Sequence, residues 1–89
     1  MTGFLGMDPQ QVRTLASQLT ANADQIDALT TALNSQLGNT PWMGPDATSF
    51  RSEWDSRHRP QLAAVAAALR EASTRATVNA QQQEQTSSA

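Results

Sequence analysis

The sequence predicts an all-α protein: an antiparallel hairpin of two long helices that pairs with a second hairpin into a four-helix bundle. Three observations lead to this fold. Apolar residues recur at helical spacing in both halves of the 89-residue chain, glycine and proline gather between the halves, and alanine and leucine supply much of the 38% apolar content. Small aliphatic side chains of this kind suit helices that pack closely side by side.

The first helix has clear signals at both of its ends. Asp8 is a suitable N-cap, Pro9 fits the first helical position, and Gln11 completes a pattern like a capping box. Gly38 is expected to follow the helix as its C′ glycine, and Pro41 stops the helix from continuing. These local signals predict where the helix begins and ends without reference to the rest of the chain.

Further signals divide the chain into an arm, a hairpin and a tail. The last residues lose their apolar periodicity and are mainly glutamine and serine, which predicts disorder. The expected organisation is a flexible N-terminal arm at 1–7, a helix-turn-helix domain at 8–80 and a disordered tail at 81–89. Within the domain we expect a first helix at about 9–37, a turn at 38–44, and a second helix at about 45–79 with a kink near residue 60.

Each helix carries an apolar seam with heptad spacing. Steps of three and four residues connect the seam positions, which is the pattern of helices that pack lengthwise against one another. Asn22 interrupts the first seam: it either specifies register or partner, or lies at the edge of the seam with its amide in water. The positions expected to hold the hairpin and the dimer together are Val12, Leu15, Leu19, Ile26, Leu29, Leu33, Leu62, Val65 and Leu69.

The second seam contains a slip ahead of Pro60. A strict heptad after Trp54 would place Arg57 and Gln61 in the seam, and both are polar. The apolar face instead resumes at Leu62, one residue after Gln61. Pro60 itself has no amide hydrogen and clashes with the preceding turn, at a cost of about 3 kcal/mol in a regular helix interior. We therefore predict a kink or a loosened turn over residues 56–60.

Length and composition favour association with another chain. A protein of 89 residues seldom stabilises itself with one core, and the absence of cysteine excludes disulfides and thiolate metal sites. Apolar residues also flank the main seams, so a lone hairpin would leave apolar surface in contact with water. We expect two hairpins to form the bundle, as a homodimer or as a heterodimer with a related chain.

Charge and hydropathy argue against other classes of partner. The net charge is −2, from six arginines and eight acidic residues without a basic stripe, so no nucleic-acid partner is expected. No apolar run reaches the roughly 18 residues of a membrane span, and the helices lack the basic polar face that binds lipid. The first eight residues lack a positive region followed by an apolar run, so no cleaved signal peptide is expected.

No residues point to catalysis, a metal or a cofactor. His58 is the only histidine and has no second metal-binding side chain nearby, so a solvated or seam-edge histidine is expected. Asp24 and Asp27 can share a helical face, but such acids usually form a solvent-exposed surface and rarely act in acid–base catalysis. No phosphate-binding glycine loop and no nucleophile beside a base is present. The protein is therefore not expected to be an enzyme.

The centre of the chain carries its most specific motif, Trp42-Met43-Gly44. Locally, Trp42 is expected to plug the open end of the hairpin, and Gly44 to permit a tight backbone path. Phe50 follows Gly44 by six residues, and Trp54 adds a second aromatic ring one turn later. We predict that Trp42, Met43 and Gly44 form a recognition turn that Phe50 and Trp54 support.

This arrangement resembles the WXG100 (ESAT-6-like) family of type VII secretion substrates, over roughly residues 8–83. The resemblance implies helical hairpins that dimerise into four-helix bundles and are exported folded, without a cleaved signal peptide. It also implies a composite signal that the secretion ATPase reads, in which the tryptophan turn of one partner lies beside a Tyr-x-x-x-Asp/Glu segment of the other. Trp42 and Gly44 match the first half of that signal.

The second half of the signal is absent, because the chain contains no tyrosine. Ala76 and Ala80 occupy the equivalent positions, and a polar pair, Asn79 and Gln83, stands nearby with the same spacing. This departure leaves two functions open.

The first function is a small type VII (ESX-like) secretion-associated protein, an exported effector or targeting partner that acts through protein–protein contacts. The type VII secretion ATPase is among its expected partners, and the protein is expected to be secreted without a cleaved signal peptide. The alternative is a cytoplasmic structural or adaptor protein that uses the same helical bundle and is not itself exported. The missing tyrosine favours the alternative.

Overall fold

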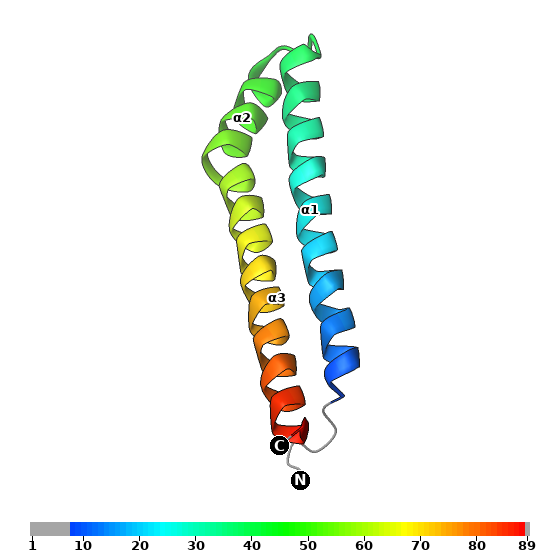
Figure 1. The fold of residues 1–89 in the computed structure, drawn as a ribbon. Coiled ribbons are helices and arrows are strands. Elements are labelled where there is room, and N and C mark those ends of the chain that lie inside the picture. The colour runs from blue at the N-terminus through cyan, green and yellow to red at the C-terminus, as the bar shows by residue number, and fades with distance from the viewer. Residues whose placement is uncertain (1–7, 89) are drawn as a thin grey trace.

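The computed structural model describes residues 8–88, which form a hairpin of two long antiparallel arms (Figure 1). This arrangement confirms the predicted all-α hairpin, while the predicted N-terminal arm at 1–7 lies outside the described residues. The first arm is one helix, and the second contains two α-helices joined by a short π-helix. The elements are α1 (Pro9–Asn39), α2 (Pro45–Glu53), the π-helix (Trp54–His58) and α3 (Arg59–Ser88).

Side-chain and main-chain caps define both ends of α1. At its start, Oδ1 of Asp8 accepts a hydrogen bond of 2.9 Å from the Gln10 amide, as expected of an N-cap. At its end, the Thr40 amide donates to the Gln36 carbonyl at 3.0 Å, and the Thr40 hydroxyl donates to the same oxygen at 2.6 Å. The prediction that Gly38 is the C′ residue is wrong, because these bonds to Thr40 close the last turn beyond it and Gly38 lies inside the helix.

The second arm widens into a π-helix at the position of the seam slip. The Arg59 amide donates to the Trp54 carbonyl five residues earlier, which is the π-helical pattern. One extra residue is thereby accommodated between Trp54 and Leu62, the two positions between which the apolar face slips. Pro60, which has no amide hydrogen to donate, is the second residue of α3. Figure 1 shows the second arm bowing away from α1 between α2 and α3.

The far end of the hairpin is ordered further than the sequence predicts. α3 continues to Ser88, which corrects the disordered tail predicted for 81–89, and Ala89 lies outside the described residues. Ala80 is fully buried, and Nη2 of Arg13 on α1 lies 2.6 Å from Oε1 of Glu84. Tertiary contacts therefore hold this end of α3 in place of the apolar periodicity that its sequence lacks.

Alanines form most of the buried interface between the arms. Among the described side chains, Trp54 is the only large apolar one that is buried, with 4% of its surface exposed. Short side chains allow the backbones of two helices to approach closely. The buried residues are Ala16, Ala23, Ala47, Trp54, Ala66 and Ala80.

The hairpin is long and thin, with Cα extents of 65 × 17 × 15 Å and a radius of gyration of 19.5 Å. A compact domain of this length would have a radius of gyration of about 12 Å. The arms therefore share one narrow interface, and most of each helix surface remains available to other molecules.

Candidate interaction site at the hairpin tip and the apolar face

The turn between the arms lies at one end of the rod and depends on Gly44. Its φ of 114° is in the region that favours glycine, and it serves as the N-cap of α2. The Thr48 amide donates to the Gly44 carbonyl at 3.0 Å, while on the other side of the turn the Trp42 amide donates to the Thr40 carbonyl at 2.8 Å. The predicted recognition turn is thus a defined backbone structure at the tip of the hairpin.

Arg51 of α2 connects the turn to the end of α1. Its Nη1 donates to the Trp42 carbonyl at 2.6 Å, and its Nη2 donates to the Thr40 carbonyl at 3.0 Å and to the Leu37 carbonyl at 2.9 Å. A further bond of 3.3 Å runs from Nε to the Leu37 carbonyl. One guanidinium group therefore satisfies carbonyls of the last helical turn, the C-cap and the turn itself.

The two side chains at the start of the recognition turn are held differently. The Trp42 ring lies 6.1 Å from the Phe50 ring, centroid to centroid, and the Arg51 guanidinium carbon lies 5.7 Å from the Trp42 ring centroid. Trp42 is 42% exposed as a result, whereas Met43 is 85% exposed. Met43 is thus the more accessible apolar side chain of the tip.

Trp54 does not belong to the tip, although the sequence grouped it with the recognition turn. Its ring is buried between the arms, where Nε1 donates to Oδ1 of Asn34 on α1 at 3.0 Å. Phe50 lies between the tip and the π-helix, since its ring is also 6.3 Å from that of His58. The structure therefore brings together Trp42, Met43, Gly44 and Phe50, and places Trp54 in the hairpin interface.

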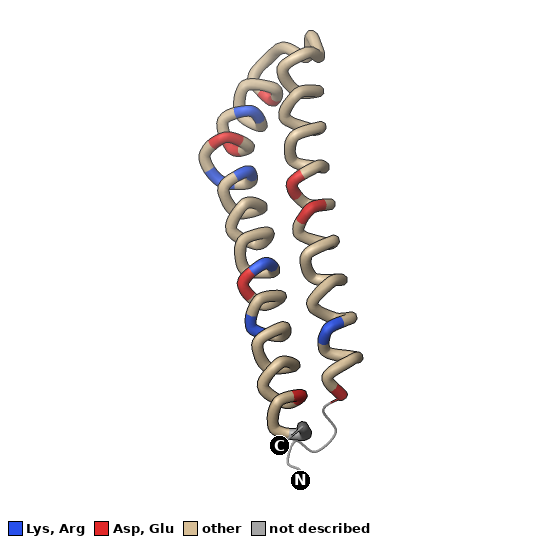
Figure 2. Tube along the Cα trace, viewed as in Figure 1, with Lys and Arg blue, Asp and Glu red and all other residues tan. Residues whose placement is uncertain are grey.

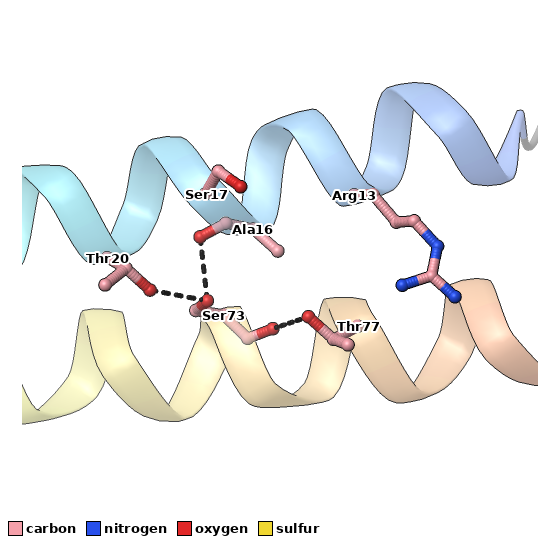
Figure 3. Close-up of a pocket in the computed structure, with 6 residues that line it drawn as sticks. All are labelled: Arg13, Ala16, Ser17, Thr20, Ser73 and Thr77. Carbon is pink, nitrogen blue, oxygen red and sulfur yellow. Dashed lines mark hydrogen bonds between the residues drawn. The ribbon is translucent and has the colours of Figure 1, made fainter.

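One edge of the interface between α1 and α3 is closed by polar contacts. The Ser73 hydroxyl donates to the Ala16 carbonyl at 2.7 Å, and the Thr20 hydroxyl lies 2.8 Å from the same Ser73 oxygen (Figure 3). Since that Ser73 hydrogen is used, Thr20 acts as the donor to Ser73. These residues line an open groove of about 470 Å³ with Arg13, Ser17 and Thr77.

Ion pairs extend this polar edge along the rod. Nη2 of Arg70 on α3 lies 2.7 Å from carboxylate oxygens of both Asp24 and Asp27 on α1, and these hydrogen bonds raise the pKa of Arg70. The Arg13–Glu84 pair lies further toward the chain ends, where its hydrogen bond raises the pKa of Arg13 and lowers that of Glu84. Asp24 and Asp27, considered above as possible acid–base groups, therefore pair with an arginine across the hairpin.

The opposite edge of the interface is apolar and exposed. Leu15 and Leu33 stand eighteen residues, or five full turns, apart and so point the same way, with Leu29 within roughly 40° of them. Leu29 is 70% exposed, Leu15 is 53% exposed, and Val65 of α3 is also exposed. The apolar face comprises Leu15, Leu29, Leu33, Val65, Ala68 and Ala72.

Shallow hollows alternate with the exposed side chains on this face. One hollow of about 160 Å³ has an almost wholly apolar lining. Its walls are Ile26, Leu29, Thr30, Leu33, Trp54 and Leu62. A surface of projecting leucines beside apolar hollows has the relief on which another helix can pack.

The nine predicted seam residues therefore fall into two groups. Five are half-buried along the hairpin interface, namely Val12, Leu19, Ile26, Leu62 and Leu69. The other four are exposed on the apolar face, namely Leu15, Leu29, Leu33 and Val65. Asn22 is half-buried, and Oδ1 of Asn22 accepts a hydrogen bond of 3.3 Å from Gln18.

The described residues offer little for metal or membrane chemistry. Over residues 8–88, no group of three or more His, Cys, Asp or Glu side chains is placed to hold a metal ion. Within the same range, no helix combines the length and the apolar character that crossing a bilayer requires. Half-buried His58 instead lines a hollow with Gln61, Leu62 and Val65.

Arg51 is the site residue that the sequence did not single out, since it was one of several charges around the predicted kink. Figure 2 shows these charges gathered on α2 and the π-helix. Glu53 pairs with Arg57 and Asp55 pairs with Arg59, each four residues apart. Spacing alone could not have identified Arg51, because Asp55 stands four residues from both Arg51 and Arg59, and only the structure shows that it pairs with Arg59.

Comparisons of this chain with protein-family models, with curated proteins and with solved structures found no match.

Proposed function

We propose that this protein is a type VII secretion-associated hairpin of the WXG100 type, an exported effector or the targeting partner of one. It works by binding other proteins and not by catalysis. The observation that carries the proposal is the asymmetry of the hairpin. Its polar edge is closed by internal hydrogen bonds and ion pairs, while its apolar face and its tip remain exposed.

The apolar face binds a second hairpin in this proposal, which gives a four-helix bundle. Covering exposed Leu29 and Leu15 removes apolar surface from water, at roughly 25 cal/mol for each Å² buried. The polar edge gains less from a partner, because Arg70 and Arg13 already have acidic partners within the chain. The second hairpin is another copy or a related chain.

The tip is the part that a type VII secretion ATPase reads in this proposal. A Trp-x-Gly turn connects the two helical arms, as it does in the family that the sequence resembles. Support comes from the exposed fraction of Met43, 85%, and from the backbone of Gly44, which holds a conformation that few other residues adopt.

The alternative function is an adaptor that stays in the cytoplasm and uses the apolar face to hold a client protein. One observation favours it. Ala80, which stands at a position where the family's second export signal is expected, is fully buried, and Ala76 is half-buried. Ala80 presents no side chain to a receptor and Ala76 presents only part of a methyl group, so export would require a partner that carries the second half of the signal.

The export proposal is tested by the fraction of this protein found in culture filtrate, with and without the type VII secretion ATPase. A cytoplasmic marker protein controls for lysis, and Met43→Ser and Trp42→Ala test the tip. ATPase-dependent release that both substitutions reduce supports the proposal. Retention of the expressed protein in both strains contradicts it and supports the adaptor.

The association proposal is tested by sedimentation of Leu29→Glu, which places a charge on the apolar face. Val78→Glu is a matched control, because Val78 is also exposed but lies roughly 140° around α3 from Val65. Leu29→Glu is expected to weaken self-association or the capture of a related chain at least tenfold, while Val78→Glu leaves it unchanged. Equal effects of the two substitutions, with helix content preserved, would contradict an interface on the apolar face.

A further inference from the structure

We infer that Arg51 is a positioning residue that fixes the conformation in which the Trp42-Met43-Gly44 turn is presented to a partner protein. The inference rests on the proposed function for the role of the turn, and on the contacts of Arg51 for the mechanism. Arg51 itself is half-buried and acts through the backbone that it holds.

The contacts of Arg51 join the last turn of α1, its C-cap residue and the turn that follows. Its guanidinium donates to the carbonyls of Leu37 at 2.9 Å, Thr40 at 3.0 Å and Trp42 at 2.6 Å. The planar guanidinium presents several N–H donors in fixed directions, so three acceptors at once restrict the path of the backbone between α1 and the turn.

Arg51 also differs from the other arginines in its ion pairing. Of the six arginines in the chain, five form ion pairs with acidic side chains, and within residues 8–88 no ion pair is found for Arg51. Its charge instead lies at the C-terminal end of α1, where the helix dipole favours a cation. Asp55, the acid four residues from Arg51, pairs with Arg59 on its other side, which leaves the Arg51 guanidinium to the three carbonyls.

The same group fixes a side chain as well as the backbone. Its guanidinium carbon lies 5.7 Å from the Trp42 ring centroid, and that ring also contacts Phe50. Trp42 is thereby held against α2, while Met43 is left 85% exposed. The Arg51 guanidinium therefore determines which apolar side chain of the turn is most exposed to a partner.

A turn fixed before binding spends more of its time in the binding-competent conformation, and the apparent affinity rises in proportion to that fraction. Loss of the Arg51 contacts is therefore expected to lower the apparent affinity for the partner without removing any group that touches the partner. A lysine at this position has a single ammonium group and cannot donate to the three carbonyls in the way that the planar guanidinium does. Arg51→Lys is therefore expected to behave like Arg51→Ala.

The first measurement is amide hydrogen exchange of purified Arg51→Ala and Arg51→Lys, with Arg59→Ala as the matched control. Arg59 has one exposed ion pair, with Asp55, and no contact with the turn is found for it among residues 8–88. We expect exchange at the Thr40 and Trp42 amides to rise about tenfold in both Arg51 variants, with the amides at the centre of α1 unchanged. Unchanged exchange at the turn in Arg51→Ala would overturn the inference, as would an equal rise along the whole of α1.

The second measurement is export of the same variants beside Met43→Ser. Reduced export of both Arg51→Ala and Met43→Ser, with unaltered self-association, supports the positioning role. Reduced export of Met43→Ser alone overturns it. If neither substitution reduces export, the proposed role of the tip in secretion fails. Hydrogen exchange at the turn then decides by itself whether Arg51 fixes the conformation of the turn.

Discussion

The indole nitrogen of Trp54 donates a hydrogen bond of 3.0 Å to the side-chain oxygen of Asn34, and this bond ties the start of the π-helix to α1. Trp54 is 4% exposed, so its N–H has lost contact with bulk water and depends on this acceptor. The pair connects the largest buried side chain of the interface to the place where the second arm departs from α-helical geometry.

Substitution of Asn34 by alanine is expected to destabilise the protein by about 1 kcal/mol, because the indole N–H loses its acceptor at a partly buried position. Ser35→Ala, at the neighbouring exposed position, serves as the control. Urea unfolding followed by far-ultraviolet circular dichroism measures both variants. The prediction is wrong if the two variants unfold at the same urea concentration.

The two glycines near the tip are expected to respond to alanine in opposite directions. Gly44→Ala forces an L-residue to a φ of 114° and should cost about 1–3 kcal/mol, although open space surrounds the added methyl group. Gly38 is helical with no atom within 4 Å of such a methyl, so Gly38→Ala should stabilise the protein by roughly 0.5–1 kcal/mol. Thermal unfolding of both variants checks the signs, and a stabilising Gly44→Ala would contradict the conformation described for the turn.

The π-helix is expected to persist in Pro60→Ala. The wider turn accommodates the extra residue between Trp54 and Leu62, and because the substitution leaves that residue in place, we expect the wider turn to remain. Nuclear magnetic resonance contacts between residues five apart, from Trp54 to Arg59, identify the π-helix. A continuous α-helix through residues 54–62 in Pro60→Ala would show instead that the proline alone imposes the wider turn.

The end of α3 is expected to loosen in acid. The hydrogen bond from Arg13 lowers the pKa of Glu84, so the pair stabilises the fold above the ordinary glutamate pKa of about 4.3. That contribution is lost as the pH falls through the lower pKa of the folded state. Hydrogen exchange at residues 81–86 should therefore accelerate at low pH relative to the centre of α3.

Glu84→Gln should show this loosening already at neutral pH and respond little to further acid. Glu71→Gln is the matched control, because Glu71 pairs with Arg75 on the same helix and does not bridge the arms. Identical exchange of residues 81–86 in Glu84→Gln and the unsubstituted protein would show that the bridge to Arg13 does not hold this end.

Features set by neighbouring residues could be predicted from the sequence. The N-cap at Asp8, the break between the arms and the position of the Trp-x-Gly motif between two helices depend on residues a few positions apart. The slip ahead of Leu62 was also visible as a break in spacing, and the structure places the π-helix beside it. The tail was not predictable in this way, since its order depends on Arg13, 71 positions earlier in the chain.

The sequence by itself determined two amphipathic helices, the turn between them and the width of their apolar stripes. Tertiary structure decided which part of each stripe faces the other arm. Ala16 and Ala23 are buried and Leu29 is left outside, because short side chains let the backbones approach closely enough for the Ser73 hydroxyl to reach the Ala16 carbonyl. Periodicity gives the angle between successive apolar residues but not the rotation of one helix against another, which depends on contacts between residues distant in the sequence.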